Sequence, residues 1–548
     1  MKRLLISSWI ILILGVILSG CSETSSRSEK NVFRYNESNG ISSLDPAFAR
    51  DLENMWAVNQ LFDGLVELDS SLNIAPLIAR SWEISEDGKT YTFHLREDVR
   101  FHESPLFEVP SERYVTAYDV FFSFNRIVEQ RIASPGQWVF AEVDFTDGKG
   151  FEVVDNQTFR IRLVRAFPPF LGMLSMQYCN VVPKEVVEHY GEDFRSNPIG
   201  TGPFKFAFWM ENVALVYHKN PYFWQKDEDG VALPYLDAVK IDFVRDMSAE
   251  FMGLVKGQYD FMSGIHPAYK DELLDPYGNL NFGFEEQIYF QHKPFIKTDY
   301  IGILVDGDLE MVQNSALSDK RVRQALNFAV DRSRMVRFLR NNAVYAAGHG
   351  FIPKGLKGYE ENSSFGFDFN LEKAAELLVE SGFPGGKGIE QIELATTSDY
   401  VDLCEFLQHA WAQIGIDVQV EVMPSAVQRE KVSRSQVMLF RKSWLADYPD
   451  AENFLGLFKS SNFCPQGPNY THFKSELFDS YYNEAIHAVN DSLRWKLYTQ
   501  MDSLIMNESP IIPLFYDQVS HFIRNEVVDF ETNPLNMLEL KRTSKVAN

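Results

Sequence analysis

Two short stretches of the chain alternate strictly between apolar and polar side chains. In residues 91–96 the side chains of Tyr91, Phe93 and Leu95 fall on one face, and residues 158–163 follow the same pattern. Successive side chains of a β-strand point to opposite faces, so a period of two is typical of a strand with one buried face. The sequence therefore predicts two half-buried strands in the first third of the chain.

The second half of the chain changes to a period near that of a helix. Apolar residues recur on one helical face in residues 322–330, and Asn370 is placed to cap a helix that Gly382 ends. Another helical stripe covers residues 403–414 and leads directly into an alternating stretch, residues 418–422. Helices that alternate with strands favour an α/β layer architecture.

The N-terminus has the pattern of an export signal. Two basic residues precede an apolar stretch over residues 4–18, which is roughly 15 residues long, whereas a membrane-spanning helix needs about 20. The stretch ends in Leu-Ser-Gly before Cys21, which resembles the lipobox of bacterial lipoproteins. We expect residues 1–20 to be removed as a signal peptide and Cys21 to carry the lipid anchor, with polar residues 21–30 as a tether. A chance cysteine beside an ordinary cleavage site is the alternative.

Length, charge and cysteine usage narrow the class of protein. The 548 residues exceed what one hydrophobic core usually supports, which predicts two or three domains. A formal net charge of −24 and a pI near 4.9 argue against nucleic acid or an anionic membrane surface as a partner. Cys179, Cys404 and Cys464 are odd in number and widely spaced, so any pairing among them stays open. We expect most of them to be buried as small apolar residues.

Motifs for catalysis and metal binding are absent from the sequence. H-E-x-x-H, G-x-S-x-G and paired C-x-x-C do not occur, and the 11 histidines show no metal-ligand spacing. Residues 382–388 resemble a phosphate loop only faintly, because the spacing is one residue short and no Ser or Thr follows Lys387. The sequence predicts no enzyme, no cofactor and no metal site.

Six stretches, spread in order along the chain, resemble one family. They include Ile-Gly-Thr-Gly-Pro-Phe at 199–204 and Trp-Leu-Ala-Asp-Tyr-Pro-Asp at 444–450. The complete set is residues 79–102, 115–124, 199–204 with 220–224, 319–332, 444–450 and 510–514. In this order, behind a lipobox, they identify the chain as a member of extracellular solute-binding family 5, the dipeptide- and oligopeptide-binding proteins of ABC importers.

The resemblance implies the fold. Family members are two-lobed clamshells of the α/β class, periplasmic binding proteins of type II, with an extra domain inserted in lobe one. By analogy, lobe one would comprise residues 31–66, 197–300 and 512–541, and the extra domain residues 67–196. Lobe two would comprise residues 301–511.

The resemblance also implies site residues. Asp447 matches the aspartate that takes the ligand's N-terminal amine in peptide-binding members, and a buried charge needs such a partner. Trp444 would supply an aromatic wall, and Arg441 would meet a ligand carboxylate as a bidentate fork. Ser443 lies on the strand whose backbone would pair with a peptide, and His349 is a weaker candidate for the rim. The plainer alternatives are a solvated or capping aspartate, a core tryptophan, a surface arginine and an exposed histidine.

The function implied is capture of peptides, or of a similar small solute, by a monomer that delivers them to the permease subunits of an ABC importer. The protein would be exported and lipid-anchored, facing the periplasm or the cell exterior. Ala451 stands where the family usually has a proline, and we expect Asp450 to cap the following helix. Two alternatives stay open. One is the same fold binding a nickel chelate, an oligosaccharide or an opine, and the other is an exported hydrolase or chaperone-like surface protein.

Overall fold

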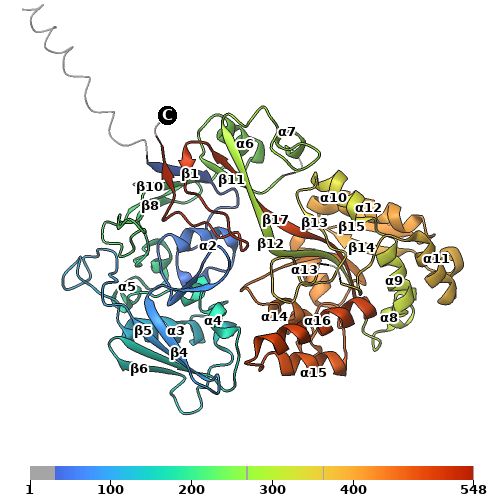
Figure 1. Ribbon diagram of the computed structural model, residues 1–548, viewed down its shortest axis with the longest axis horizontal. Helices are drawn as coiled ribbons and strands as arrows, with labels where there is room; N and C mark the ends of the chain where they lie inside the picture. The colour runs from blue at the N-terminus through green and yellow to red at the C-terminus, as the bar shows by residue number, and fades with distance from the viewer. Residues whose placement is uncertain (1–30, 267–268, 362, 547–548) are drawn as a thin grey trace, which may run out of the picture.

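One mixed β-sheet of eleven strands runs through the protein and joins its two halves (Figure 1). The computed structural model describes residues 31–266, 269–361 and 363–546. The predicted signal peptide, Cys21 and the tether lie outside these residues. Along the sheet the strand order is β15-β14-β16-β12-β17-β11-β1-β10-β9-β8, and β13 pairs with β17 away from this path. In order of sequence the strands are β1 (Val32–Asn36), β8 (Phe204–Met210), β9 (Ala214–Lys219), β10 (Ala238–Asp242), β11 (Phe261–Ser263), β12 (Ile288–Ile303), β13 (Tyr345–Ala346), β14 (Ile392–Thr396), β15 (Val418–Val422), β16 (Leu439–Leu445) and β17 (Ile511–Arg524).

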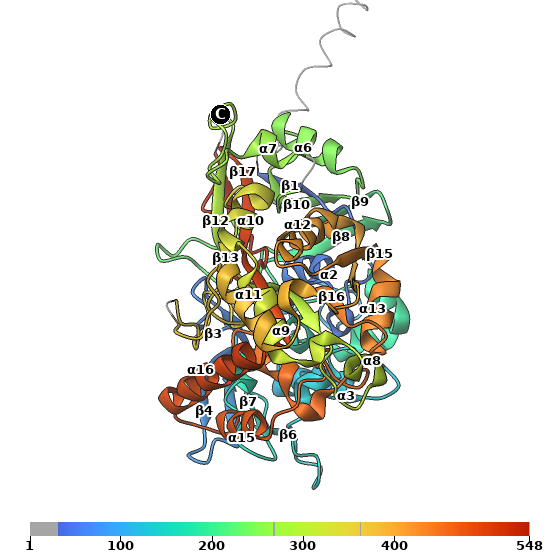
Figure 2. The same cartoon turned by 90° about the vertical axis from the view of Figure 1, so that its right-hand side faces the viewer.

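Two long antiparallel strands, β12 and β17, belong to both halves of the sheet. Residues 297–303 of β12 pair with β16, and residues 521–523 of β17 pair with β11. Their mutual register shifts between Pro294 and Thr298, where proline has no N–H to donate to the ladder. Figures 1 and 2 show the pair side by side from both directions. The chain thus crosses between the halves on β12 and returns on β17.

Helices cover the part of the sheet built from β14, β15 and β16, which gives this half an α/β arrangement. They are α9 (Lys320–Phe328), α10 (Arg332–Arg340), α11 (Leu371–Glu380) and α12 (Val401–Ala412). The predicted helices over 322–330 and 403–414 and the strand over 418–422 are confirmed. The Asn370 side chain accepts a hydrogen bond from Lys373 N, and Gly382 follows the end of α11 with φ +92°, so both predicted ends are confirmed as well.

A separate four-stranded antiparallel sheet lies in the first third of the chain, in the order β4-β5-β7-β6. Its strands are β4 (Ala79–Ile84), β5 (Thr90–Leu95), β6 (Phe151–Asp155) and β7 (Thr158–Arg162), and α3 (Ala117–Val128) packs on it. Tyr91, Phe93 and Leu95 are all buried, as the alternation predicted. Phe124 of α3 packs its ring on Phe159 of β7 with centroids 5.7 Å apart, so this sheet and helix share one aromatic core.

The remaining elements are short, apart from α16, an 18-residue helix that packs on α15. They are α2 (Leu52–Asn59), α4 (Phe170–Met173), α5 (Lys184–Tyr190), α6 (Met247–Val255), α7 (Lys270–Leu273), α8 (Glu310–Gln313), α13 (Ser425–Ser433), α14 (Glu452–Leu455), α15 (Glu476–Ala485), α16 (Asp491–Glu508), β2 (Val66–Leu68), β3 (Ile74–Pro76), β18 (Val527–Val528) and β19 (Ser544–Lys545). Within the described residues no helix is both long and apolar enough to cross a membrane.

The three cysteines of the described residues are buried free thiols, which confirms their expected role as small core residues. They are Cys179, Cys404 and Cys464.

Candidate functional site

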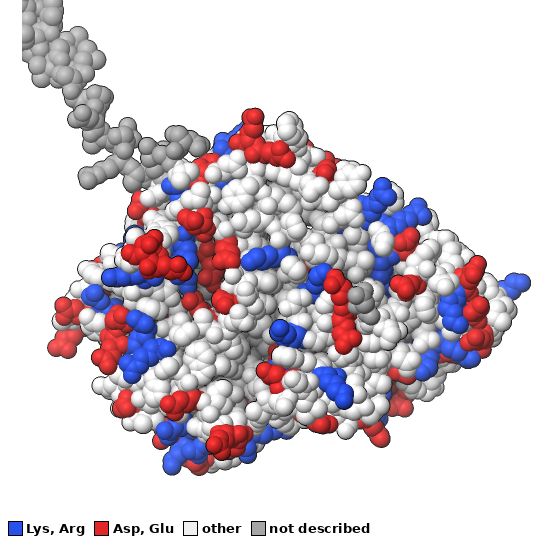
Figure 3. Space-filling view, viewed as in Figure 1, with Lys and Arg blue, Asp and Glu red and all other residues white. Residues whose placement is uncertain are grey.

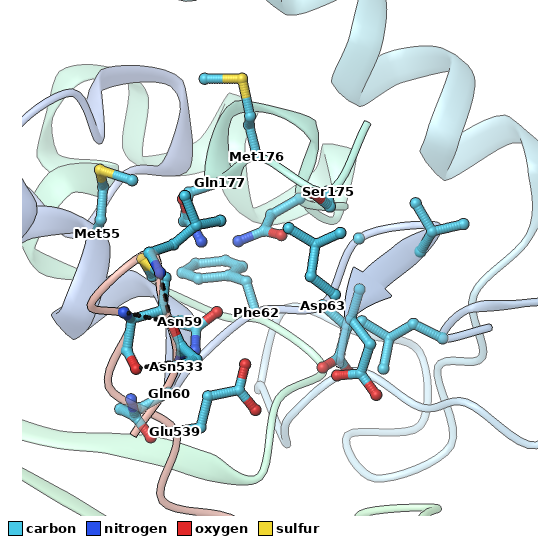
Figure 4. Close-up of a pocket in the computed structure, with 18 of the residues that line it drawn as sticks. Met55, Asn59, Gln60, Phe62, Asp63, Ser175, Met176, Gln177, Asn533 and Glu539 are labelled. Atoms are coloured by element: carbon cyan, nitrogen blue, oxygen red, sulfur yellow. Dashed lines mark hydrogen bonds between the residues drawn. The ribbon is translucent and has the colours of Figure 1, made fainter. Parts of the chain in front are cut away.

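A pocket lies where the loop after β16 meets the N-terminal and C-terminal segments of the chain. We name it the Asp447 pocket. Its empty volume is about 1190 Å³, including the solvent at its mouth, and its wall is partly apolar and partly acidic. The loop contributes residues 445–447, the N-terminal segment residues between 50 and 77, and the C-terminal segment residues between 533 and 541. Figure 4 draws 18 of the lining residues as sticks and labels ten of them, with Ser175, Met176 and Gln177 near Phe62 and Asp63. Four stretches distant in the sequence therefore share one cavity.

The loop that presents Asp447 is fixed by hydrogen bonds to Asn453 in α14. The Asn453 amide donates to Asp447 Oδ2 at 3.2 Å, while its oxygen accepts from Trp444 Nε1 at 2.9 Å and from Asp447 N at 3.2 Å. Asp450 accepts a hydrogen bond from Glu452 N at 3.0 Å, at the start of α14, but the N-cap residue of this helix is Ala451 and not Asp450 as expected. Ala451 is buried and begins the turn without a proline. Asn453 thus joins two of the predicted site residues.

The Asp447 side chain is in contact with solvent, and protein atoms also surround it. Its side chain is exposed in the pocket, while the surrounding protein raises the pKa of its carboxyl above the usual value, against the lowering effect of the Asn453 hydrogen bond. Neither Lys nor Arg among the described residues forms an ion pair with it. Arg50 and Lys541 also line the pocket, but they pair with Asp51 and Glu67. A carboxylate held in this way is able to accept hydrogen bonds from a ligand cation.

Arg441 is buried and already has a counter-ion. Its guanidinium pairs with Asp299 of β12 and lies 3.1 Å from the ring centroid of Tyr400. Asp299 is also 3.0 Å from Lys297 Nζ, and this lysine bonds Asp517 at 2.6 Å. Because Arg441 is one member of a buried ion network and does not line the Asp447 pocket, its contact with a ligand carboxylate stays a prediction. The alternative of a surface arginine is wrong, since the residue is 8% exposed.

The other predicted residues differ in how near they lie to the Asp447 pocket. Ser443 lies on β16 directly opposite Asp299 in the ladder, and Trp444 is half-buried beside Asn453. His349 does not line the Asp447 pocket. Its backbone oxygen accepts a hydrogen bond from Ser363 at 2.7 Å, in a loop elsewhere on the chain. The structure therefore brings Asp447 to the pocket with Trp444 behind it, and leaves His349 apart.

Several lining residues were missed from the sequence. Asp63, Glu67 and Glu539 bring three carboxylates to the pocket, and Lys541 pairs with Glu67 at 2.5 Å. Lys541 and Glu67 are 474 positions apart, so no local pattern signals their meeting. Asn453 lies three residues after Asp450, within α14, and no spacing in the sequence signals that this helix approaches the Asp447 loop.

The described residues hold no group of three His, Cys, Asp or Glu side chains that could ligate a metal ion. Figure 3 shows acidic and basic side chains mixed over one face of the molecule, without a continuous basic surface there. The chemistry available in the Asp447 pocket is therefore recognition by carboxylates, amides and apolar walls.

Comparisons with known proteins bear on the fold of the chain. Heme-binding protein A of Haemophilus influenzae is 28% identical over 91% of both chains, and the dipeptide-binding protein of Escherichia coli is 25% identical over 88% of this chain and 89% of its own. The structure of HbpA2 from Haemophilus parasuis superposes with a TM-score of 0.77 at 25% identity, covering 94% of this chain and all of that one. A periplasmic DppA of Helicobacter pylori in complex with the peptide STSA gives 0.74 at 24% identity, covering 94% and 97%. The predicted α/β binding-protein fold is thus confirmed.

The family described as bacterial extracellular solute-binding proteins, family 5 (middle), matches residues 73–463, which is most of the chain. Its members bind solutes without catalysis, as the absence of enzyme motifs predicted. With its six family stretches, its fold and its pocket beside the β16 loop, this chain belongs to the family 5 solute-binding proteins of ABC importers.

Proposed function

We propose that this protein captures peptides with a free amino terminus in the Asp447 pocket and delivers them to an ABC permease. The observation that carries the proposal is Asp447 itself, an exposed carboxylate that the Asn453 amide positions and that pairs with no Lys or Arg in the part of the chain that the structure describes. A protonated α-amine supplies the missing charge. Residues 442–445 of β16 pair with β12 on one side and not with β14 on the other, so that side is where an extended chain would pair.

The proposal uses the predicted division into lobe one, the extra domain at 67–196 and lobe two. Asp447 comes from lobe two, while the facing wall of the pocket comes from lobe one and the extra domain. A ligand that contacts both walls favours the closed arrangement by its differential affinity. We also propose export with a lipid anchor at Cys21.

The test is a thermal-shift and calorimetry screen of the mature chain. The panel contains di- to pentapeptides, their N-acetylated forms, glutathione, heme, nickel–histidine and an oligosaccharide. A ligand specific for the folded state at a hundredfold excess over its Kd adds about 2.7 kcal/mol to the free energy of unfolding, so binders stand out.

We expect free-amine peptides to stabilise the wild type, and this effect to disappear on N-acetylation and in Asp447→Asn. Asp308→Asn, which changes an exposed aspartate outside the pocket, serves as the matched control. A protein that ignores peptides and responds to glutathione or heme would remain a solute-binding protein and would refute the peptide proposal. Peptides that bind Asp447→Asn as tightly as wild type would remove the anchor role.

A further inference from the structure

The wall of the Asp447 pocket opposite the β16 loop carries more negative charge than the protein itself neutralises. We name Asp63, Glu67 and Glu539 the acidic cluster. Lys541 Nζ lies 2.5 Å from Glu67 Oε2 and 4.0 Å from Glu539 Oε2, and Thr201 donates a hydrogen bond to Asp63 at 2.9 Å. One ammonium group thus serves two of the carboxylates, and Asp63 has a hydroxyl rather than a cation as its partner.

The ion pair between Glu67 and Lys541 links the C-terminal segment to β2, so Glu67 has a structural role. This ion pair does not explain why Asp63 and Glu539 also lie in the pocket. Burial raises the pKa of Asp63 to about 6 and that of Glu539 to about 7, in both cases against the lowering effect of Lys541 and with a further rise from Glu67. Like charges that share a partly buried space resist ionisation together, and an added cation relieves this resistance.

A second and independent feature of the same wall is an unsatisfied amide. Asn180 is 7% exposed and lines the Asp447 pocket, and its Nδ2 has no hydrogen-bond partner among the described residues. A buried N–H that is left unpaired costs about 1–3 kcal/mol, so such a group is normally matched by an acceptor. An acceptor supplied by a ligand, such as a peptide carbonyl oxygen, would satisfy it.

The space continues beyond the acidic cluster. A neighbouring hollow opens on Glu67, Glu539 and Lys541 and is further lined by Asp529 and Glu531. A long side chain that entered from the Asp447 pocket would therefore meet carboxylates along its path. Arg542 and Lys541 are the basic residues of that lining, and Lys541 is already bound to Glu67.

We propose that the pocket selects peptides with a second positive charge, a lysine or arginine side chain close to the free amino terminus. The α-amine binds Asp447 on one wall, the side-chain cation binds the acidic cluster on the other, and Asn180 donates to a carbonyl oxygen between them. This inference rests on the proposed function, because it assumes a peptide whose amine is at Asp447. The two cations hold together two walls that otherwise present like charges to each other.

The decisive comparison uses one peptide in two forms. Lys-Ala and the same dipeptide with its lysine Nε acetylated share length, shape and a free α-amine, and they differ in the side-chain charge. Isothermal titration of the full mature chain at pH 7.5 is expected to give about tenfold or tighter binding of Lys-Ala, since hydrogen bonds to charged groups are worth about 1.5–3 kcal/mol. Glu539→Gln should bring the ratio of the two Kd values toward one, whereas the exposed Glu272→Gln, outside the pocket, should leave that ratio as in wild type.

The outcomes separate this inference from the function on which it rests. Equal affinity for the two forms overturns the charge selection and leaves peptide capture standing. Binding of neither form, in a panel that includes other free-amine peptides, overturns both. Spermidine is included as a polycation that is not a peptide. If it binds in place of every peptide, the acidic cluster is a cation site in a protein that does not capture peptides, and the proposal fails.

Discussion

At the scale of single residues, Asn453 is the side chain that makes Asp447 usable. Its amide group donates to the carboxylate and accepts from both Trp444 Nε1 and Asp447 N, so one side chain fixes the loop and its aromatic neighbour together. The motif pointed to Asp447 and Trp444, while the role of Asn453 depends on α14 turning back toward β16, which no spacing in the sequence reveals.

Replacing Asn453 should therefore weaken binding more than folding. We expect Asn453→Ala to lose about 10- to 150-fold in affinity for a free-amine peptide, because one hydrogen bond to a charged group is worth about 1.5–3 kcal/mol. Because the lost hydrogen bond had lowered the pKa of Asp447, affinity should also decline at a higher pH on acidification. Calorimetry between pH 4.5 and 8 measures both effects. Asn507→Ala, an exposed change at the end of α16, is the control, and equal affinity in the two variants would contradict this role.

A buried carboxylate far from the pocket predicts how stability depends on pH. Asp502 is 3% exposed and accepts hydrogen bonds from Phe351 N at 2.8 Å and Ile352 N at 3.4 Å, and burial raises its pKa to about 7. The unfolded chain has the ordinary value near 3.9, so the folded state binds the proton more tightly. This contribution to stability is complete below about pH 4 and is lost as the pH rises through about 7.

Asp502→Asn removes that titration. Relative to the variant, the wild type should lose about 3 kcal/mol of unfolding free energy between pH 4.5 and pH 8. Urea unfolding at several pH values measures the difference, and taking the difference cancels the titration of other buried groups. As a control, Asp308→Asn changes an exposed aspartate, and its free energy of unfolding should vary with pH in the same way as that of the wild type. A parallel curve for Asp502→Asn would show that Asp502 is ionised in the folded protein throughout this range.

At the scale of elements, amphipathic patterns predicted the helices and the half-buried strands well. The alternation in β5 and the stripes of α9 and α12 report which face meets a core, and local sequence is sufficient for that. The long strand β12 was not predicted, because it contains Pro294 and carries Lys297 and Asp299 in its buried part. These two charged residues fit a buried strand because each forms an ion pair with a residue from a distant segment. Lys297 pairs with Asp517, and Asp299 pairs with Arg441.

The turn between α12 and β15 provides a prediction at this scale. Gly415 has φ +82°, and a Cβ there would lie 2.2 Å from Gly385 O, whereas Gly382 has φ +92° with open space around it. The positive φ at both positions disfavours an L residue, at a cost of about 1–2 kcal/mol. Only at Gly415 would the added Cβ also clash with the backbone of another segment. We expect Gly382→Ala to cost about that amount and Gly415→Ala at least about 2 kcal/mol more. Equal midpoints of urea unfolding for the two variants would contradict the close backbone approach.

At the scale of the whole molecule, the family resemblance supplied what local patterns could not. Parallel pairing of β1 with β10 and the meeting of Glu67 with Lys541 join segments separated by hundreds of residues. The acidic wall of the pocket exists only through such meetings, so the sequence pointed to the amine anchor and missed the carboxylates opposite it. The assignment of residues 67–196 to a separate extra domain stays a prediction. If it holds, the extra domain contacts lobe two across the pocket.

Those contacts are visible between the first third of the chain and the region around Asp447. Trp138, in the turn Gln137–Phe140, packs on Tyr448 with ring centroids 6.1 Å apart, and His487 Nδ1 lies 2.8 Å from Ala166 O. Tyr448 is the residue directly after the proposed anchor, so the aromatic contact is made at the edge of the pocket. If the lobes close on the ligand, this contact exists in the closed arrangement and contributes to its population.

Removing the Trp138 ring should then weaken binding without touching the ligand. Aromatic pairs contribute about 0.5–1.5 kcal/mol beyond their buried area, so Trp138→Ala should raise the Kd for a bound peptide about 2- to 12-fold. Small-angle scattering with and without a saturating peptide should still show contraction in the variant, because ligand in excess restores the closed population. Tyr118→Ala, at a residue 61% exposed in the same region, is the control. A variant with the wild-type Kd would show that the contact is equally present without ligand, and that closure takes place elsewhere in the molecule.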